Sequence, residues 1–303
     1  MVTQTTLKSG GRIRQSAGDR VLDLFIYVWL IFVAMLVLYP LVYVFSASIS
    51  NPEHVVTGKM WLIPMDFTSV GYTKLLQDKD VLLGYRNTLF YVSAGTLVNV
   101  VMTVLAAYPL SRRDFVGRGA ITAFFAFTLF FSGGLIPTYL LIKSLHMVNT
   151  FWAIIIPTAV SVLNIVIMRT SLEHGIPNEL IESASMDGCG DLRMLFRIVL
   201  PLSLPILAVM VLYYAVWNWN TYFNAMIYLN DREKFPLQLF LRDILVRGEF
   251  NELQTGEFSI QRVLEGETIK YAMVIVANLP MLLLYPFLQK YFVKGVLIGA
   301  IKG

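Results

Sequence analysis

Six long apolar runs dominate the sequence and restrict what it can fold into. Each run has the roughly 20 residues that a helix needs to cross the hydrocarbon core of a bilayer. The runs are continuous rather than alternating, which excludes the strands of a transmembrane β-barrel. We therefore expect an all-α integral membrane protein with six transmembrane helices. The expected spans are residues 24–47, 87–111, 119–142, 148–168, 202–229 and 271–293.

We expect prolines to break two of these spans. Pro157 lies in the fourth span, and Pro280 and Pro286 lie in the sixth, where we expect breaks. Membrane helices tolerate such breaks because neighbouring groups can hydrogen-bond the freed carbonyls. In the third span, "SGGLIP" (Ser132–Pro137) combines two glycines with a proline. We expect this stretch to serve close packing or a hinge rather than to bind a ligand.

Composition agrees with the membrane class. Hydrophobic residues make up 56% of the chain and charged residues 15%, whereas soluble domains are nearer a quarter charged. The net charge of +4 fits basic cytoplasmic loops, so we expect no nucleic-acid partner. The first run begins near Val21 and is too long for a signal-peptide core, so we expect a retained anchor after a cytoplasmic segment of residues 1–20. A single cysteine, Cys189, excludes an intramolecular disulfide.

Basic residues flank the spans on one side of the membrane, as the positive-inside rule requires of cytoplasmic loops. They precede the first span, follow the second and close the chain, so we expect both termini to be cytoplasmic. Long loops of about 48–86 and 230–270 are then external, and residues 170–201 form an internal loop. The flanking residues are Lys8, Arg12, Arg14, Arg20, Arg112, Arg113, Arg118, Lys290, Lys294 and Lys302.

The internal segment "ELIESASMDGCGDLRMLFRIVLP" (Glu179–Pro201) is unusually polar for this chain. Pro177 suits the first turn of a short helix, and Gly188 suits the left-handed residue that ends it. Asp191 can cap a second short helix. The segment is therefore expected to form two helices with an elbow at Gly188. On physical grounds alone, an amphipathic connector on the lipid surface is an equally good interpretation.

The same segment resembles the EAA loop of ATP-binding-cassette (ABC) importer permeases. The spacing E-x-A-x-x-x-G-x(9)-I-x-L-P runs from Glu182 to Pro201, with Ser183 where the family usually has alanine. Three further segments resemble the carbohydrate permeases of this family, and the last is similar to the ending of the second, maltose-type subunit. They are "AAYPLSRRDFVGR" (Ala106–Arg118), "WNWNTYFNAMIYLND" (Trp217–Asp231) and "YFVKGVLIGAIKG" (Tyr291–Gly303).

The resemblance implies a type I ABC importer permease fold over residues 21–303, in a bacterial cytoplasmic (inner) membrane. The EAA loop, about 170–201, would be the coupling helix region that contacts an ATPase. The implied partners are a second homologous permease subunit, two ATP-binding-cassette ATPase subunits, an extracytoplasmic solute-binding protein, an oligosaccharide substrate and membrane lipid. The implied coupling residues are Glu182, Ser183, Ala184, Asp187 and Gly188.

The chain has no phosphate-binding G-x-x-x-x-G-K-[ST] loop. We therefore expect ATP and Mg to bind the partner ATPases, and this chain to be a non-catalytic subunit without a cofactor of its own. His54, His146 and His174 lie far apart, so we expect no metal site and no catalytic constellation.

The fifth span carries aromatic rings and amides of the kind that bind sugars. The same residues are compatible with an interfacial aromatic belt or with hydrogen bonds between helices. The following stretch "YLNDREKFPLQLFLRDILV" resembles permeases for complex or acidic oligosaccharides, such as alginate or pectin fragments. The candidate substrate-path residues are Tyr214, Trp217, Asn218, Trp219, Asn220 and Asn224.

The expected function is thus a permease subunit of an ATP-driven sugar importer, and two other functions stay open. An ion-coupled secondary carrier is disfavoured for protons, because the apolar cores contain no Asp, Glu, Lys, Arg or His, and Lys290 stands only at the end of the sixth range. A sodium site made of carbonyls remains compatible with the sequence. A membrane-embedded enzyme would need clustered acidic residues at a membrane boundary, and the only such cluster belongs to the EAA-like segment.

Overall fold

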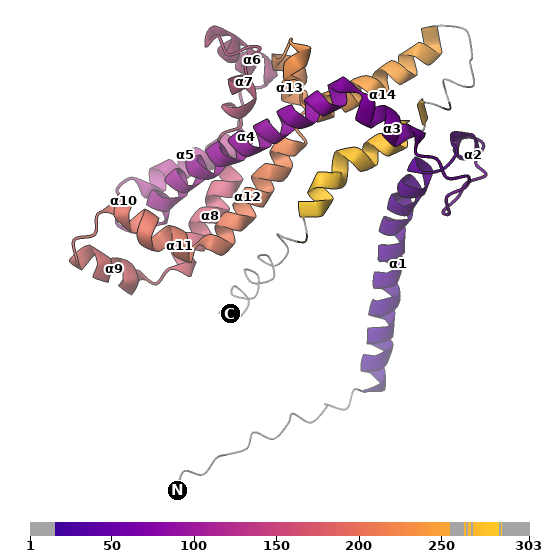
Figure 1. The fold of residues 1–303 in the computed structure, drawn as a ribbon. Helices are drawn as coiled ribbons and strands as arrows, with labels where there is room; N and C mark the ends of the chain where they lie inside the picture. The colour runs from indigo at the N-terminus through magenta and orange to yellow at the C-terminus, as the bar shows by residue number, and fades with distance from the viewer. Residues whose placement is uncertain (1–15, 255–263, 265, 268, 285, 287–303) are drawn as a thin grey trace.

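The computed structural model describes residues 16–254, 264, 266, 267, 269–284 and 286. Over these residues the chain is helical and contains no strand, which confirms the expected all-α class. Figure 1 shows a body of helices arranged along the long α4, and a first helix that stands apart from this body.

The separate helix is α1 (Ala17–Ser48), which runs for 32 residues and confirms the first expected span. Most of its apolar side chains are exposed. Its contacts with the rest of the described chain gather at the C-terminal end, where Tyr43 meets Tyr271 edge-on and the short α2 (Pro52–Val56) packs nearby. Figure 1 shows the two ends of α1 at very different distances from the body.

The second expected span is α4 (Lys79–Ser111), which follows α3 (Val70–Gln77). It begins earlier than predicted because the Asp78 carboxylate caps it, accepting the N–H two residues on at 2.8 Å. Helices α8, α12 and α14 pack against α4. Two glycines of α4, Gly84 and Gly95, allow these neighbours to approach closely. The helix is therefore the axis on which the body is assembled.

The third expected span, 119–142, is not one helix. It consists of α5 (Arg118–Phe130) and α6 (Leu135–Ser144), whose axes are bent by 114°. The four intervening residues include Phe131 in an extended conformation and Gly134 with a φ of +80°. Glycine adopts this left-handed backbone without strain. The stretch predicted to serve packing or a hinge is thus a sharp bend.

The fourth expected span, 148–168, is broken at the predicted proline. A short α7 (Trp152–Ile155) precedes Pro157, and α8 (Val162–Gly175) follows it. α8 runs beyond the expected end of the span, so its last two turns carry polar residues.

The polar internal segment forms the two short helices expected there. They are α9 (Asn178–Met186) and α10 (Asp191–Met194). The expected side-chain cap by Asp191 is wrong. Gly190 occupies the N-cap position, and Asp191 is the first helical residue, where its charge still complements the helix dipole.

A π-helical turn, η1 (Leu195–Val199), and α11 (Leu200–Leu202) connect α10 to the next long helix. The π turn ends at Val199, two residues before Pro201, which has no N–H to continue an α-helical pattern. The segment up to Leu202 is bent by 85° against α12 (Leu204–Trp219). The internal segment therefore meets the following span at a steep angle.

The fifth expected span, 202–229, is also divided. α12 ends at Trp219, and α13 (Phe223–Tyr228) follows after a short break. The Asn220 amide and the Thr221 hydroxyl donate back to carbonyls of α12 at 2.8 and 3.2 Å. These bonds compete with a continuing helix, which explains why α12 is shorter than predicted.

The expected external loop 230–270 is largely helical where it is described. It contains η2 (Arg232–Lys234) and the 18-residue α14 (Leu237–Gln254). The sixth span is described as the helix Ile269–Leu284. The rest of that expected span, together with the "YFVKGVLIGAIKG" ending, lies outside the described residues apart from Pro286.

Pro280 does not break the helix Ile269–Leu284, contrary to expectation. A proline leaves the carbonyl four residues earlier without a donor, here that of Val276. The Tyr85 hydroxyl from α4 donates to this carbonyl. A neighbouring helix therefore satisfies the freed group and keeps the helix continuous.

By length and composition, α1 and α4 are each long and apolar enough to cross a membrane. The count rises to four if α5 with α6, and Asp191–Leu202 with α12, each form one bent span. The third, fourth and fifth apolar runs are thus broken or bent, whereas the first two and the described part of the sixth are continuous helices.

Candidate functional site

A sharp elbow joins α9 to α10 at Gly188. This residue has a φ of +74°, in the left-handed region. The N–H of Gly188 donates to the Ser185 carbonyl at 3.0 Å, and the N–H of Cys189 donates to the Ala184 carbonyl at 2.9 Å. These two bonds are those of a Schellman motif, which ends a helix on a left-handed residue. The structure confirms the bend that the sequence predicted at Gly188.

The five predicted coupling residues lie together on α9 and its elbow. Ala184 is buried, with 7% of its surface exposed, and packs in a core cluster with Met194 and Tyr108. The other four are exposed to solvent, so α9 rests on the body through one side and leaves the rest of its surface accessible. The exposed residues are Glu182, Ser183, Asp187 and Gly188.

An ion pair fastens α8 to α5 just before the elbow. Arg118 Nη2 donates to both carboxylate oxygens of Glu173 at 2.7 Å, and Arg169 reaches the same carboxylate at 3.7 Å. The side chains of Arg118 and Glu173 are only 22% and 23% exposed. The hydrogen bond from Arg118 holds the pKa of Glu173 below its usual range.

A second set of contacts holds the loop between α4 and α5 against α10. Arg112 binds the Asp114 carboxylate at 2.9 Å and reaches the Met194 sulfur at 3.1 Å. Tyr108 donates to the Asp191 carbonyl at 3.4 Å. The Arg112 guanidinium also lowers the pKa of Asp114. In the sequence, Arg112 and Arg118 could be recognised only as basic flanks, because Met194 and Glu173, which they contact, lie far along the chain on other helices.

Two of the predicted path residues bind neighbouring helices instead. The Asn218 amide donates to Asn99 Oδ1 at 3.0 Å and to Thr96 Oγ1 at 3.4 Å, both on α4. The Trp219 indole donates to the Ala277 carbonyl at 2.9 Å. Both side chains are buried. For these two residues the structure favours the interpretation as hydrogen bonds between helices.

The other four path residues differ in their surroundings. The hydroxyl of Tyr214 is buried and lies 2.6 Å from that of Thr103. Trp217 is 62% exposed. Asn220 is exposed and donates to a carbonyl of its own helix, whereas Asn224 is partly exposed on α13. The six residues therefore do not form one surface.

A cavity of about 1280 Å³ lies between α1, the start of α8, α12 and the helix Ile269–Leu284. Tyr214 and Trp217 are the predicted path residues that line it. Its wall is mostly apolar, with a few hydrogen-bonding groups. These groups include Thr158, Ser161, Asn164, Tyr213 and Asn278.

Comparison with known proteins identifies the family to which this chain belongs. Residues 81–298 match the family model described as the binding-protein-dependent transport system inner membrane component. The match includes the elbow, the arginine contacts and all the predicted path residues, and it sets aside the ion-coupled carrier.

Two proteins of Bacillus subtilis (strain 168) are similar over nearly the whole chain. The polygalacturonan/rhamnogalacturonan transport system permease protein YtcP is 41% identical over 290 residues, which are 94% of this chain and 99% of YtcP. Protein LplC is 36% identical over 96% of this chain and 98% of its own length.

A solved structure shares the fold. It is the crystal structure of a bacterial ABC transporter involved in the import of the acidic polysaccharide alginate. One chain of it aligns with a TM-score of 0.82 and 34% identity, covering 92% of this chain and 99% of that one. On the family match and these alignments, the chain belongs to the inner membrane components of binding-protein-dependent transport systems.

Proposed function

We propose that this chain is a transmembrane permease subunit of an ATP-driven importer for acidic oligosaccharides. The observation that carries the proposal is the similarity, over more than nine tenths of the chain, to a polygalacturonan/rhamnogalacturonan permease and to a chain of an alginate importer. All three polymers named there are rich in sugar carboxylates. Fragments of such polymers are the substrate class that these two relatives have in common.

The elbow of α9 and α10 supports a role in coupling to an ATPase. It is a protruding, largely exposed feature whose base is fixed to the body by the Arg118–Glu173 ion pair. A partner that grips the exposed residues of α9 would therefore move α8 and α5 with it. ATP and Mg would be bound by two partner ATPase subunits, and this chain would contribute no catalytic group.

The remaining partners follow from the same proposal. A second homologous permease subunit would complete the translocation path, and a solute-binding protein would deliver the substrate from outside. The chain would span a bacterial cytoplasmic membrane several times, with both termini and the elbow in the cytoplasm. α14 would then lie on the external side.

Uptake by the reconstituted complex tests this function. The permease pair, its ATPases and the binding protein are placed in proteoliposomes, and uptake of trigalacturonate and an alginate trimer is compared with that of maltotriose. We expect ATP-dependent uptake of an acidic trimer in preference to the neutral one. Uptake of neither acidic trimer, or uptake that continues without ATP, would overturn the proposal.

A further inference from the structure

A small pocket of about 440 Å³, lined by both polar and aromatic residues, opens at the end of α4 that is remote from the elbow. It lies between α4, the loop before α7, and η2. We call it the α4–η2 pocket, and its key lining residues are Arg86, Phe90, Asn149 and Glu233. Along its axis, α4 extends about 37 Å from Arg86 at the pocket to Ser111 beside the elbow. This length slightly exceeds the thickness of the hydrocarbon core of a bilayer. The pocket and the elbow therefore belong to opposite faces of the membrane.

The α4 wall of the pocket combines an arginine with an aromatic ring. Arg86 and Phe90 are one helical turn apart and so lie on the same side of α4. Phe90 is 50% exposed and is held edge-on against Phe151, with ring centroids 5.6 Å apart. Arg86 is exposed, and within the described part of the chain its guanidinium has no ion pair.

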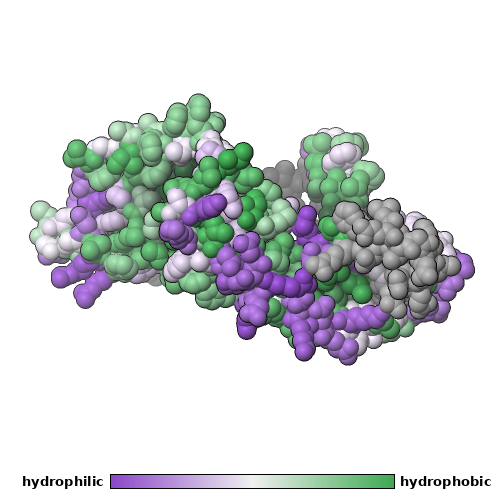
Figure 2. Space-filling view, turned by 90° about the horizontal axis from the view of Figure 1, so that it is seen from above, coloured by the Kyte–Doolittle hydropathy of each residue, from purple (hydrophilic) through white to green (hydrophobic). Residues whose placement is uncertain are grey.

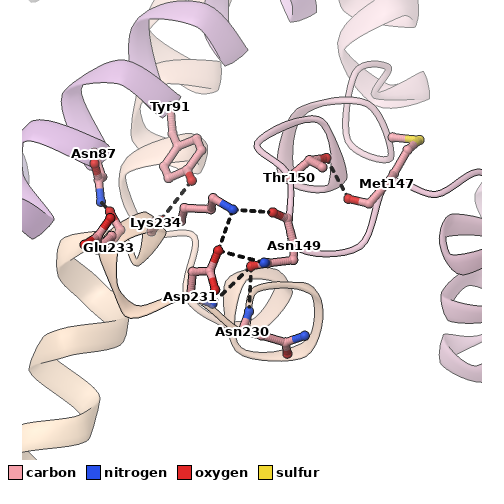
Figure 3. Close-up of polar contacts among 9 residues, drawn as sticks. All are labelled: Asn87, Tyr91, Met147, Asn149, Thr150, Asn230, Asp231, Glu233 and Lys234. Atoms are coloured by element: carbon pink, nitrogen blue, oxygen red, sulfur yellow. Dashed lines mark hydrogen bonds and ion pairs between the residues drawn. The ribbon is translucent and has the colours of Figure 1, made fainter.

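The opposite wall is held by a hydrogen-bond network around Asn149 (Figure 3). The Asn149 side chain accepts the backbone N–H groups of Asn230 and Asp231 at 3.1 and 3.0 Å, and donates to the Asp231 carboxylate at 2.8 Å. Lys234 Nζ binds the Asn149 carbonyl at 2.9 Å and the Asp231 carboxylate at 2.6 Å. The charge of Lys234 is therefore already balanced by Asp231.

α4 also fixes this second wall directly. Asn87 donates to the carbonyls of Glu233 and Phe235 at 2.7 and 3.0 Å, and Tyr91 donates to the carbonyl of Lys234 at 2.8 Å. Figure 3 shows these side chains converging on the chain before α14. The backbone of the pocket is thus arranged before any ligand arrives, which lowers the entropic cost of binding.

The groups left available in this fixed frame are the Arg86 guanidinium and the exposed face of Phe90. A guanidinium binds a carboxylate through two parallel hydrogen bonds, and an aromatic face packs on the C–H surface of a sugar ring. We propose that the α4–η2 pocket receives one uronate unit of an acidic oligosaccharide, with its carboxylate on Arg86 and its ring on Phe90. This inference rests on the proposed function and names a contact site for its substrate.

The remaining charge in the pocket, Glu233, sets the strength of this contact. Its carboxylate repels a uronate, so binding at the pocket is weak and readily reversed. Weak binding suits a site on a transport path, which must release what it receives. Figure 2 shows hydrophilic residues gathered from the middle to the lower edge of the face seen from above, beside a large hydrophobic area.

The test uses the reconstituted complex with its binding protein and measures trigalacturonate uptake below saturation. We expect Arg86→Gln to lower the uptake about tenfold, because a charge-assisted bidentate contact is lost. Arg86→Lys should recover part of the loss, Phe90→Leu should lower uptake, and Glu233→Gln should raise it. Arg242→Gln, which removes an exposed positive charge from α14 outside the pocket, is the matched control and should leave uptake unchanged.

Three results would overturn the site. One is unchanged uptake in Arg86→Gln. Another is an equal loss in Arg86→Gln and Arg242→Gln, which would indicate bulk charge. The third is weaker binding of the solute-binding protein to Arg86→Gln, which would make the pocket a protein docking surface. If the wild-type complex imports no acidic trimer, both the proposed function and the proposed site are wrong. If the wild-type complex imports an acidic trimer but any of these three results is found, only the proposed site is wrong.

Discussion

Arg118 and Glu173 lie 55 residues apart in the sequence, yet Arg118 Nη2 is 2.7 Å from both carboxylate oxygens of Glu173. The pair joins the start of α5 to the end of α8, which directly precedes α9. Because the two side chains are only about a fifth exposed, the pair is intermediate between a surface ion pair and a buried one.

Arg118→Gln should therefore destabilise the protein by about 1–2 kcal/mol, between the values for exposed and buried pairs. We expect the unfolding temperature in detergent to fall by a few degrees. The charge exchange Arg118→Glu with Glu173→Arg should recover only part of this loss, because the new arginine would face Arg169. No loss in the single variant, or no recovery at all in the exchanged pair, would show that the pair does not hold the two helices.

The same pair predicts a pH dependence. The pKa of Glu173 is lowered in the folded protein by its hydrogen bond from Arg118. A lowered folded-state pKa stabilises the fold at pH values above the unfolded pKa, and this stabilisation is lost as the pH falls through the folded value. The difference in unfolding temperature between wild type and Glu173→Gln should thus be largest near pH 7 and should shrink below about pH 4. A difference that stays constant down to pH 3 would contradict this account.

Gly188 offers a test of the coupling role that separates backbone strain from packing. A Cβ at Gly188 would meet no atom within 4 Å, so only its φ of +74° opposes a side chain. Valine in the left-handed region costs about 1–2 kcal/mol and would distort the elbow, whereas asparagine tolerates that region better. We expect Gly188→Val and Glu182→Lys to abolish substrate-stimulated ATP hydrolysis in the assembled complex, and Gly188→Asn to retain much of it. Normal coupled transport in Gly188→Val and Glu182→Lys would refute the coupling assignment.

Gly84 predicts where α14 is fixed to α4. A Cβ at Gly84 would lie 2.9 Å from the Leu237 Cα and 2.8 Å from the Phe240 ring. Since the Leu237 backbone cannot move away without loosening its hydrogen bond to Thr88, Gly84→Ala should cost about 1–3 kcal/mol. Gly119→Ala is the matched control, because a Cβ there meets nothing within 4 Å and alanine favours a helix. Equal unfolding temperatures for the two variants would contradict the packing argument.

The two tryptophans of α12 should respond in opposite ways to the same substitution. Trp219 is 1% exposed and its indole is hydrogen-bonded to Ala277, so Trp219→Ala should cost about 3–5 kcal/mol and reduce folded protein. Trp217 is 62% exposed on the cavity, so Trp217→Ala should keep wild-type stability and change only the transport rate. Measurements of unfolding temperature and uptake on both variants distinguish these roles. A folded, transport-normal Trp219→Ala would show that the buried contact is dispensable.

Local features of the sequence were enough to predict several parts of the fold. The long apolar runs predicted α1 and α4, because a charge-free run of that length has few other stable conformations in a membrane. The elbow at Gly188 could be predicted because the Schellman motif that forms it involves only residues adjacent in the sequence. The break at Pro157 is local for the same reason.

Other features depend on partners far along the chain, which local patterns do not reveal. Pro280 leaves its helix unbroken because the hydroxyl of Tyr85 on α4 satisfies the freed carbonyl. Asn218 and Trp219 stay predictions as path residues, but the sequence could not show that they donate hydrogen bonds to Asn99 on α4 and to the Ala277 carbonyl. No periodicity or spacing encodes such contacts.

The isolated position of α1 has a consequence for how the protein is made. The helix satisfies its own backbone hydrogen bonds and, over most of its 32 residues, needs no neighbour within the described chain. It can therefore enter the bilayer and fix the orientation of the polypeptide while the ribosome is still synthesising α4. Insertion of the anchor and docking of Tyr43 on Tyr271 are then separate events in biogenesis, and the second must wait until almost the whole chain has emerged.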